Sequence, residues 1–287
     1  MKHHFVPVFY LKHFTLDDGF FYIFDVTRNK FKKNGQKFSP DSHFYLVNLN
    51  TVYNGLEKTE FVETAFSKHD NAISKIVDKI AQDESNQLTP HEWTYLQYFI
   101  NILYWRNPSA TAQLTKLIGE AQNLSPFGMS MRNTTTGQRL TDEEERRWTL
   151  DNPEFVKYLR LSISGSTYPQ VFAKTEQDHV TIITFPPGLP KLVSDNPVIY
   201  LNEEGESLHT APLIFPITPT KVLFRHLRPN LTLINGIRVM IDMILFAQAT
   251  NYVSCTDHRY PALLSAAYNE KYTSVQPLKH KLAQLLK

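Results

Sequence analysis

Two adjacent histidines, His3 and His4, stand at the start of the chain. Imidazole is the commonest side chain among transition-metal ligands and the one best suited to proton transfer near neutral pH. The pair therefore predicts a general base or a metal site, with His4 as base or ligand and His3 as a further ligand. The cofactor stays open, with a divalent metal as the candidate. The alternative is that both imidazoles form only local hydrogen bonds, while Tyr10, Leu11 and Phe14 anchor the segment in the core.

Two carboxylates and one guanidinium further along the chain could complete such a site. Glu63 and Asp70 are seven residues apart on a predicted helix, so they share one face, where they could bind a metal or act as acid and base. Arg106 ends the next predicted helix, and a guanidinium is well suited to bidentate binding of a phosphate or carboxylate. A solvated helix flank and a favourable helix dipole are the alternative explanations of these residues.

A polar turn at 194–197 supplies two more candidates, Asp195 and Asn196. Either side chain could orient a site histidine. The competing interpretation is that both bond only to their own backbone, as Asx side chains in turns often do.

Three other polar features have structural interpretations. His69 falls within the apolar stripe of a predicted helix, and we interpret it as a core histidine with a hydrogen-bond partner. Arg238 and Asp242 are spaced as an i,i+4 ion pair on an otherwise apolar helix, which predicts structural pairing. Cys255 has only Asp257-His258 near it in the sequence, so a thiol nucleophile is the disfavoured interpretation.

The composition indicates a soluble globular protein and excludes several classes. Hydrophobic residues make up 42% of the 287 residues, and 30 Lys and Arg against 28 Asp and Glu leave a formal charge of +2. This balance gives no general signal for nucleic acid, although a local basic patch is compatible with it. The single cysteine excludes an intramolecular disulfide and a four-thiolate zinc site, and neither glycine-rich nucleotide-binding motif occurs. No apolar run is long enough for a signal peptide or a membrane span, so we expect a cytoplasmic protein with no membrane partner.

The periodicity of apolar residues predicts an α+β fold, with a central helical bundle flanked by short, mainly antiparallel strands from the N-terminal and C-terminal parts. We expect a single domain over residues 1–287, made of a strand-rich segment at 1–53, a helical segment at 54–165, and strands plus one long apolar helix at 176–287. Thr89 and Thr141 are predicted to cap two of the helices. Other helices are expected at 7–14, 56–81, 110–121, 153–163 and 235–249, and strands at 20–26, 44–47, 180–185, 198–201, 213–217, 221–227 and 252–255.

The opening of the chain carries His4, Val6, Pro7, Tyr10, Leu11 and Phe14 in one register. These residues resemble the H-x-V-P-x-x-Y-L-x-x-F signature of a widespread bacterial family of uncharacterised proteins. Blocks similar to that family follow along nearly the whole chain: 39–40, Tyr45, Glu63, 70–71, 106–108, 194–198, 216–219, Asn235, Ala247 and 252–253. The resemblance implies a stand-alone bacterial protein of unknown function, with some members in phage-defence or toxin-like settings, and it implies no proven activity.

Together these residues predict a hydrolase of a phosphate-containing substrate, most specifically a nuclease-like effector in phage defence. The hypothesis assigns His4 as general base or ligand, Glu63 or Asp70 as its carboxylate partner, Arg106 as the phosphate clamp, and Asp195 and Asn196 as the groups that hold the histidine. The alternatives are a non-catalytic module for ligand sensing or protein interaction, with the N-terminal segment as a latch, and a toxin directed at a nucleotide or NAD. The expected partners are nucleic acid or a nucleotide, a second copy of the chain, or a protein encoded in the same operon.

Overall fold

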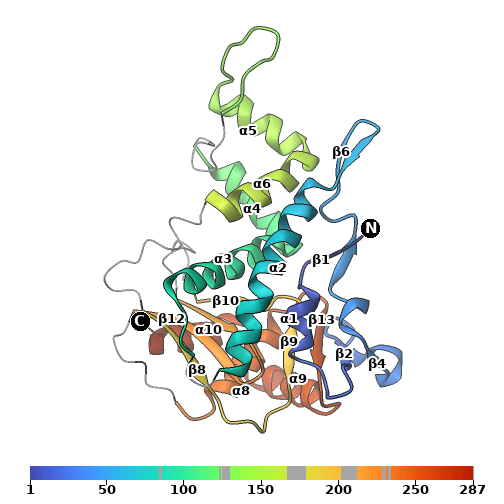
Figure 1. The fold of residues 1–287 in the computed structure, drawn as a ribbon, viewed down its shortest axis with the longest axis vertical. Helices are drawn as coiled ribbons and strands as arrows, with labels where there is room; N and C mark the ends of the chain where they lie inside the picture. Colours follow the sequence, from blue (N-terminus) through green and yellow to red (C-terminus); the bar gives the residue numbers. More distant parts are fainter. Residues whose placement is uncertain are drawn as a thin grey trace.

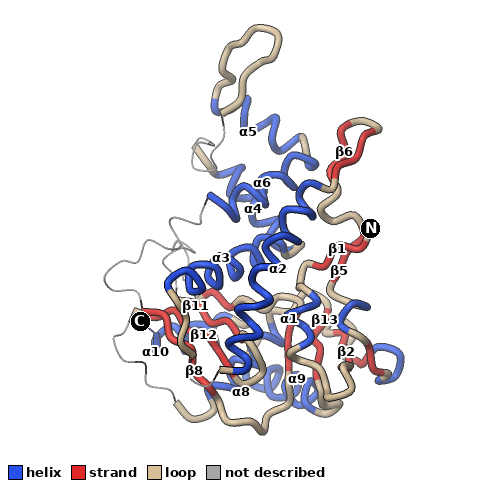
Figure 2. Tube along the Cα trace, in the orientation of Figure 1, coloured by secondary structure: helices blue, strands red, loops and turns tan. Residues whose placement is uncertain are grey.

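The chain folds into an α+β structure in which a group of helices extends from a body built of small antiparallel sheets (Figure 1). The structure is a computed structural model and describes residues 1–83, 86–122, 124, 130–166, 179–201, 212–227, 231 and 234–286. In Figure 2 most strands gather in the lower body, whereas the upper part consists of helices, one small hairpin and a long loop at its tip. The predicted fold class, helices flanked by short antiparallel strands, is confirmed.

The first strand of the chain is short and was not expected from the sequence. Strand β1 (Lys2–His4) pairs with β5 (Tyr45–Val47) and places His4 opposite Tyr45. Three residues are too few to show the alternation of polar and apolar side chains by which a strand is predicted. The pairing nevertheless decides which way each of the two histidines faces.

The helix that follows, α1 (Val8–Lys12), anchors the N-terminal segment in the core. Tyr10 and Phe14 are fully buried, and the Tyr10 ring stacks on Phe215 with a centroid distance of 5.4 Å. The Tyr10 hydroxyl donates a 2.6 Å hydrogen bond to the carbonyl oxygen of Pro216. The predicted anchoring role of these aromatic residues therefore agrees with their burial.

Two larger antiparallel sheets form the body. Their strands are β2 (Phe21–Asp25), β3 (Lys30–Phe31), β4 (Lys37–Phe38), β8 (His179–Thr184), β9 (Leu192–Ser194), β10 (Ile199–Tyr200), β11 (Leu213–Pro216), β12 (Lys221–His226) and β13 (Tyr252–Cys255). One sheet has the order β10-β11-β12-β8, and the other has the order β3-β2-β13-β9 with β4 also paired to β2. Strand β13 lies between β2 and β9, so Tyr252 lies opposite Asp25. A strand from the N-terminal part of the sequence is thereby paired with one from the C-terminal part.

After α1, the helices of the described chain are α2 (Phe61–Gln82), α3 (Pro90–Arg106), α4 (Ser109–Glu120), α5 (Asp142–Asp151), α6 (Pro153–Ser166), α8 (Ile237–Ala247), α9 (Tyr260–Lys271) and α10 (Gln276–Leu286). Five of these described helices, α3 to α6 and α8, begin and end within a few residues of the predicted positions, and the three others differ from the prediction. Thr89 and Thr141 form the predicted capping boxes with Glu92 and Glu144. Each box satisfies backbone N–H groups that the first turn of a helix leaves unpaired.

Two predictions about the elements were wrong. Helix α2 begins at Phe61 instead of 56, because residues before it form the hairpin β6 (Val52–Asn54) and β7 (Glu57–Thr59) around Gly55, whose φ is +62°. The C-terminal part contains α9 and α10 in addition to the one predicted helix α8. Helix α9 has a weak apolar pattern, whereas α10 carries Leu278, Leu282 and Leu286 at helical spacing, a signal that the prediction missed. The predicted boundary at 165–176 falls largely outside the described residues.

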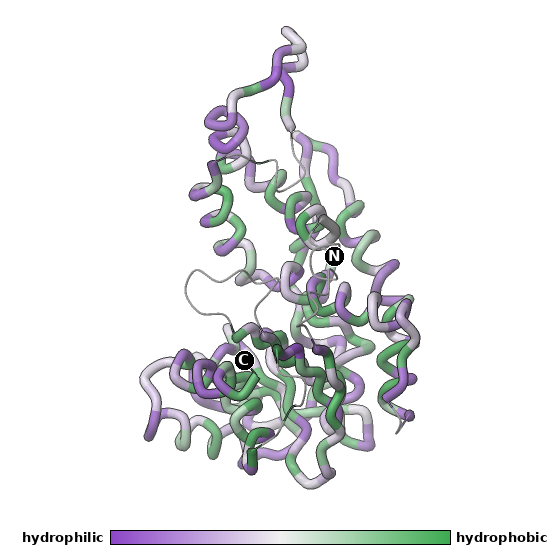
Figure 3. The backbone as a smooth tube through the Cα atoms, turned by 90° about the vertical axis from the view of Figure 1, so that its left-hand side faces the viewer, coloured by the Kyte–Doolittle hydropathy of each residue, from purple (hydrophilic) through white to green (hydrophobic). Residues whose placement is uncertain are grey.

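The apolar residues concentrate in the body, whereas the end of the helical part around α5 is mainly hydrophilic (Figure 3).

One buried ion pair lies in this body: Arg238 Nη2 is 2.9 Å from Asp242 Oδ1, and the Tyr260 hydroxyl donates to the same carboxylate at 2.8 Å. The predicted structural pairing of Arg238 and Asp242 is therefore present. Among the described helices, none is both long enough and apolar enough to cross a membrane.

Candidate functional site

His3 and His4 face opposite sides of strand β1, as successive side chains of a strand do. His3 is fully buried and contacts Asn50 and Glu60, whereas His4 is half-buried beside Asp41. The two imidazoles therefore do not converge on one point as a pair of metal ligands would. Within the described ranges, no group of three or more His, Cys, Asp or Glu side chains could hold a metal ion.

Arg106 is the centre of a buried polar cluster between α2 and α3. Its Nη1 lies 2.7 Å from Asp70 Oδ2, and its Nη2 lies 3.5 Å from Glu63 Oε1. The guanidinium also lies over the Phe66 ring, 5.2 Å from its centroid, and the side chain is only 2% exposed. The structure thus brings together three of the predicted site residues. Because the guanidinium already faces two carboxylates, it is not available as the predicted phosphate clamp.

His3 belongs to the same cluster through Asn50. The His3 Nδ1 accepts a hydrogen bond from the backbone N–H of Asn50 at 2.9 Å, so the ring proton is on Nε2, which faces Glu60 Oε2 at 3.2 Å. The Asn50 side chain donates to Glu63 at 2.7 Å and accepts from Arg160 at 2.8 Å. Burial lowers the pKa of His3 despite the two nearby carboxylates. Its Nδ1 is hydrogen-bonded, and its Nε2 lies close to Glu60 without forming a hydrogen bond, so His3 connects β1 to the residues just before α2.

His4 has the geometry of a general base. Its Nε2 lies 3.2 Å from the carbonyl oxygen of Asp41, which can only accept, so Nε2 carries the ring proton. Its Nδ1 has no hydrogen-bond partner among the residues described. Burial lowers the pKa of His4, and Arg106 lowers it further, against the opposing effects of Glu63 and Asp41. The ring is therefore neutral at pH 7, with one nitrogen oriented and the other free to accept a proton.

A small cavity of about 90 Å³ lies beside His4, and we call it the N-terminal cavity. Its lining includes Phe5, which follows His4 in the chain, and Tyr45, whose ring centroid is 5.4 Å from that of His4. Asn107, Asp195 and Tyr252 also line it. Three of the predicted blocks, at the start of the chain, the end of α3 and the turn at 194–197, therefore meet around this cavity.

Within the part of the chain that the structure describes, the side chains of Asp195 and Asn196 bond to backbone groups and not to a histidine. The Asp195 carboxylate accepts three backbone hydrogen bonds, from the N–H groups of Thr250, Asn251 and Tyr252, at 2.7–2.9 Å. Asn196 exchanges side chain to backbone hydrogen bonds with Gln248. Burial raises the pKa of Asp195, and the three N–H donors oppose that rise. Both residues fix the loop that leads into β13 and so position Tyr252.

Two lysines lie against tyrosines that line the N-terminal cavity, and neither was among the site residues predicted from the sequence. Lys2 Nζ lies 4.5 Å from the centre of the Tyr45 ring, and Lys32 Nζ lies 4.5 Å from that of Tyr252. After burial, the charges of Lys2, Lys32 and Lys33 are what lower the pKa of His43 to about 4. The signal in the sequence was the stretch 30–37, which contains four lysines in eight residues. This is a local basic patch within a chain of balanced charge.

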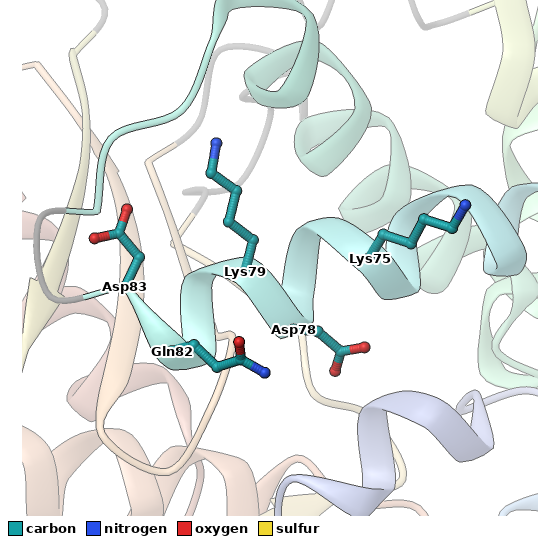
Figure 4. Close-up of a pocket in the computed structure, with 5 residues that line it drawn as sticks. All are labelled: Lys75, Asp78, Lys79, Gln82 and Asp83. Atoms are coloured by element: carbon teal, nitrogen blue, oxygen red, sulfur yellow. The ribbon is translucent and has the colours of Figure 1, made fainter.

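Other candidate groups are engaged elsewhere. An open groove of about 530 Å³ follows the last turns of α2, but the side chains that line it splay apart (Figure 4). Within it, Asp78 pairs with His13 at 3.1 Å and Lys79 pairs with Glu92 at 2.8 Å. We therefore find no convergent set of groups there.

His69 and Cys255 also stand apart from the cavity. His69 is only half-buried and contacts the Tyr98 ring at 4.8 Å, so it lies at the edge of the core instead of inside it. Cys255 is fully buried, and burial raises the pKa of its thiol to about 12, which disfavours a thiolate nucleophile.

The fold and the site define an α+β protein with a buried polar cluster and a half-buried histidine beside a lysine-rimmed cavity. The chain belongs to the family described as Protein of unknown function (DUF4238), whose match covers residues 2–230. The family membership expected from the sequence is thereby confirmed, and both the cavity and the buried cluster involve residues within the matched range. Comparisons with the curated proteins and with the solved structures found no match.

Proposed function

We propose that the protein is a hydrolase of phosphate-containing substrates in which His4 is the general base. The observation that carries the proposal is the ring of His4, whose Nε2–H is oriented by the carbonyl oxygen of Asp41 while Nδ1 is free. A base must be neutral at the working pH and must have a lone pair directed at the proton it removes. The lowered pKa of His4 satisfies the first condition, and the hydrogen bond to Asp41 satisfies the second.

The phosphate contact in this proposal comes from lysine and not from Arg106. Lys2 lies beside Tyr45, the residue opposite His4 in the β1–β5 pair, so its ammonium group stands close to the proposed base. Lys32 lies against Tyr252, a second tyrosine that lines the cavity. Two cations next to a cavity attract an anionic substrate and favour the negative charge that develops during phosphoryl transfer.

The specific form of the proposal is a nuclease-like effector, acting in phage defence within the bacterial cytoplasm. Its substrate would then be nucleic acid or a nucleotide. We expect hydrolysis to depend on His4 whichever of these substrates is used. Because the described residues supply no set of metal ligands, a chelator tests whether hydrolysis requires a metal.

A single comparison tests the base. Wild-type protein and His4→Gln are assayed for hydrolysis of a chromogenic phosphodiester and of labelled RNA and DNA, with and without EDTA. Gln keeps a donor for the Asp41 carbonyl but cannot accept a proton, so we expect hydrolysis to fall about 10²- to 10⁴-fold. His91→Gln is the matched control, because His91 is exposed on α3 and its ring contacts Tyr95, whereas the His4 ring contacts Tyr45 of the cavity. Equal activity of the two variants contradicts the proposal.

The second candidate is a non-catalytic module for ligand sensing or protein interaction, with the N-terminal segment as a structural latch. The observation that favours it is the burial of Val6, Tyr10 and Phe14 together with the engagement of Arg106 by its two carboxylates. This candidate predicts no turnover by the wild type on any of the three substrates, and a binding curve that is the same for His4→Gln.

A further inference from the structure

The N-terminal cavity has two aromatic walls, and a lysine lies against each of them. Tyr45 is on the edge strand β5, and Tyr252 is on the central strand β13. Lys2 and Lys32 each place an ammonium group 4.5 Å from one of these rings. Tyrosine rings next to lysine side chains at a concave surface are the combination by which proteins bind unpaired bases and their phosphates.

The size of the cavity limits what can enter it. A volume of about 90 Å³ is well below the roughly 300–1,000 Å³ of pockets that enclose a whole small molecule. That space admits the edge of one planar ring and excludes a whole nucleotide. The walls from Phe5, Tyr45 and Tyr252 are aromatic, and Asn107 contributes an amide. A flat, partly polar ring suits these walls, whereas a charged phosphate group has to stay outside them.

The charged groups outside the cavity are positioned for that phosphate. Lys2, Lys32 and Lys33 all act on the buried imidazole of His43, so their charges share one side of the molecule. Two acidic groups belong to this region. The Asp41 carboxylate accepts a hydrogen bond from Ser39, and the carboxylate of Asp195, which lines the cavity, accepts three backbone N–H groups. Three cations from two separate segments can contact more than one phosphate group. A polynucleotide has several phosphate groups, whereas a small anion has one.

We propose that the N-terminal cavity binds the edge of one base of a single-stranded nucleic acid, and that Lys2, Lys32 and Lys33 bind the phosphates on either side of that base. The inference rests on the proposed function, because it names the substrate class of the same site. A duplex is disfavoured, since its bases are stacked and paired and cannot reach the rings without unpairing.

The test is fluorescence anisotropy with labelled 12-nucleotide RNA and DNA of the same sequence, their duplexes, and a labelled mononucleotide. We expect both single strands to bind more tightly than the duplexes and the mononucleotide. Tyr45→Leu and Tyr252→Leu should each weaken binding of a single strand roughly tenfold or more, because each removes a stacking surface. The matched control is Tyr53→Leu, a tyrosine on β6 that also lies near a lysine, Lys157, but does not line the cavity.

The lysines are tested by salt dependence. Lys2→Gln and Lys32→Gln should each reduce the slope of log affinity against log salt by about 0.7, the value expected for one phosphate contact on a single strand. Lys68→Gln, an exposed lysine on α2, should leave the slope unchanged. These lysine variants lie at or near the surface, so they test the site even if Tyr252→Leu fails to fold.

The outcomes separate this inference from the proposed hydrolysis. Binding that His4→Gln retains, without turnover by the wild type, supports the nucleic-acid site and overturns the hydrolase. Turnover of a small phosphodiester without binding of any single strand overturns the nucleic-acid site and leaves the hydrolase standing. Equal effects of Tyr53→Leu and Tyr45→Leu, or equal affinity for single strands and duplexes, also overturn the inference.

Discussion

Arg106 and Asp70 lie 2.7 Å apart, from Nη1 to Oδ2, although 36 residues separate them in the chain. The contact joins the end of α3 to the middle of α2, and it leaves the guanidinium 2% exposed. A guanidinium so placed has lost nearly all of its hydrating water, and contacts with the two carboxylates take the place of that water. The pair thus favours a role for Arg106 in the packing of the two helices.

We predict that Asp70→Leu lowers the free energy of unfolding by about 3 kcal/mol, because it leaves the buried Arg106 with only the longer contact to Glu63. Urea unfolding measures the change. The double variant Arg106→Met/Asp70→Leu should recover most of the loss, since it removes the unpaired charge. Losses that simply add in the double variant would contradict the role of the pair.

The pH dependence of hydrolysis should report His4. Its pKa lies below the ordinary value of 6.5 because of burial and Arg106. The base acts only when neutral, so kcat/KM should stay level from pH 8 down to about 6.5 and fall only at more acidic pH. Initial rates measured across pH 4.5–8 give the profile. A decline that already begins above pH 7 would exclude His4 as the titrating base.

Asp195 should matter for stability and not for chemistry. Asp195→Ala removes the acceptor of the backbone N–H groups of three residues, two of which, Thr250 and Asn251, are exposed, so water replaces part of it. We therefore expect a loss of about 1–3 kcal/mol by chemical denaturation, with the turnover rate per folded molecule close to that of the wild type. Asp17→Ala, at an exposed position, is the control and should change stability by less than about 0.5 kcal/mol. If a folded Asp195→Asn variant turned over substrate roughly a hundredfold more slowly, a catalytic role would be restored.

His43 should make the fold sensitive to acid. Its pKa is lowered from 6.5 to about 4 in the folded chain, by burial and by three lysines. Between pH 6.5 and 4 the unfolded chain therefore binds a proton that the folded chain does not, so stability falls as the pH falls through this window. The contribution is at most about 3 kcal/mol. His43→Phe should lose this part of the pH dependence, which urea unfolding at pH 4.5 and 7 would show; an unchanged difference between the two pH values argues against it.

The features that the sequence by itself determined are those that depend on neighbours a few residues away. The capping boxes at Thr89 and Thr141 follow from contacts three residues apart, and the Arg238–Asp242 pair follows from one turn of helix. The common face of Glu63 and Asp70 likewise follows from two turns. Helical periodicity and capping are local, so these predictions needed no knowledge of the rest of the chain.

What only the tertiary structure decided is where each polar side chain turns. Because β1 is a strand, the His3 side chain points into the buried cluster and the His4 side chain points toward Asp41. The two adjacent histidines in the sequence do not by themselves indicate these opposite orientations. The Asp195 carboxylate finds its donors 55 to 57 residues later. Tyr45 and Tyr252 come together only because β13 inserts beside β2. Sheet pairing and the packing of buried charges join distant segments, and no local pattern in the sequence specifies which segments meet.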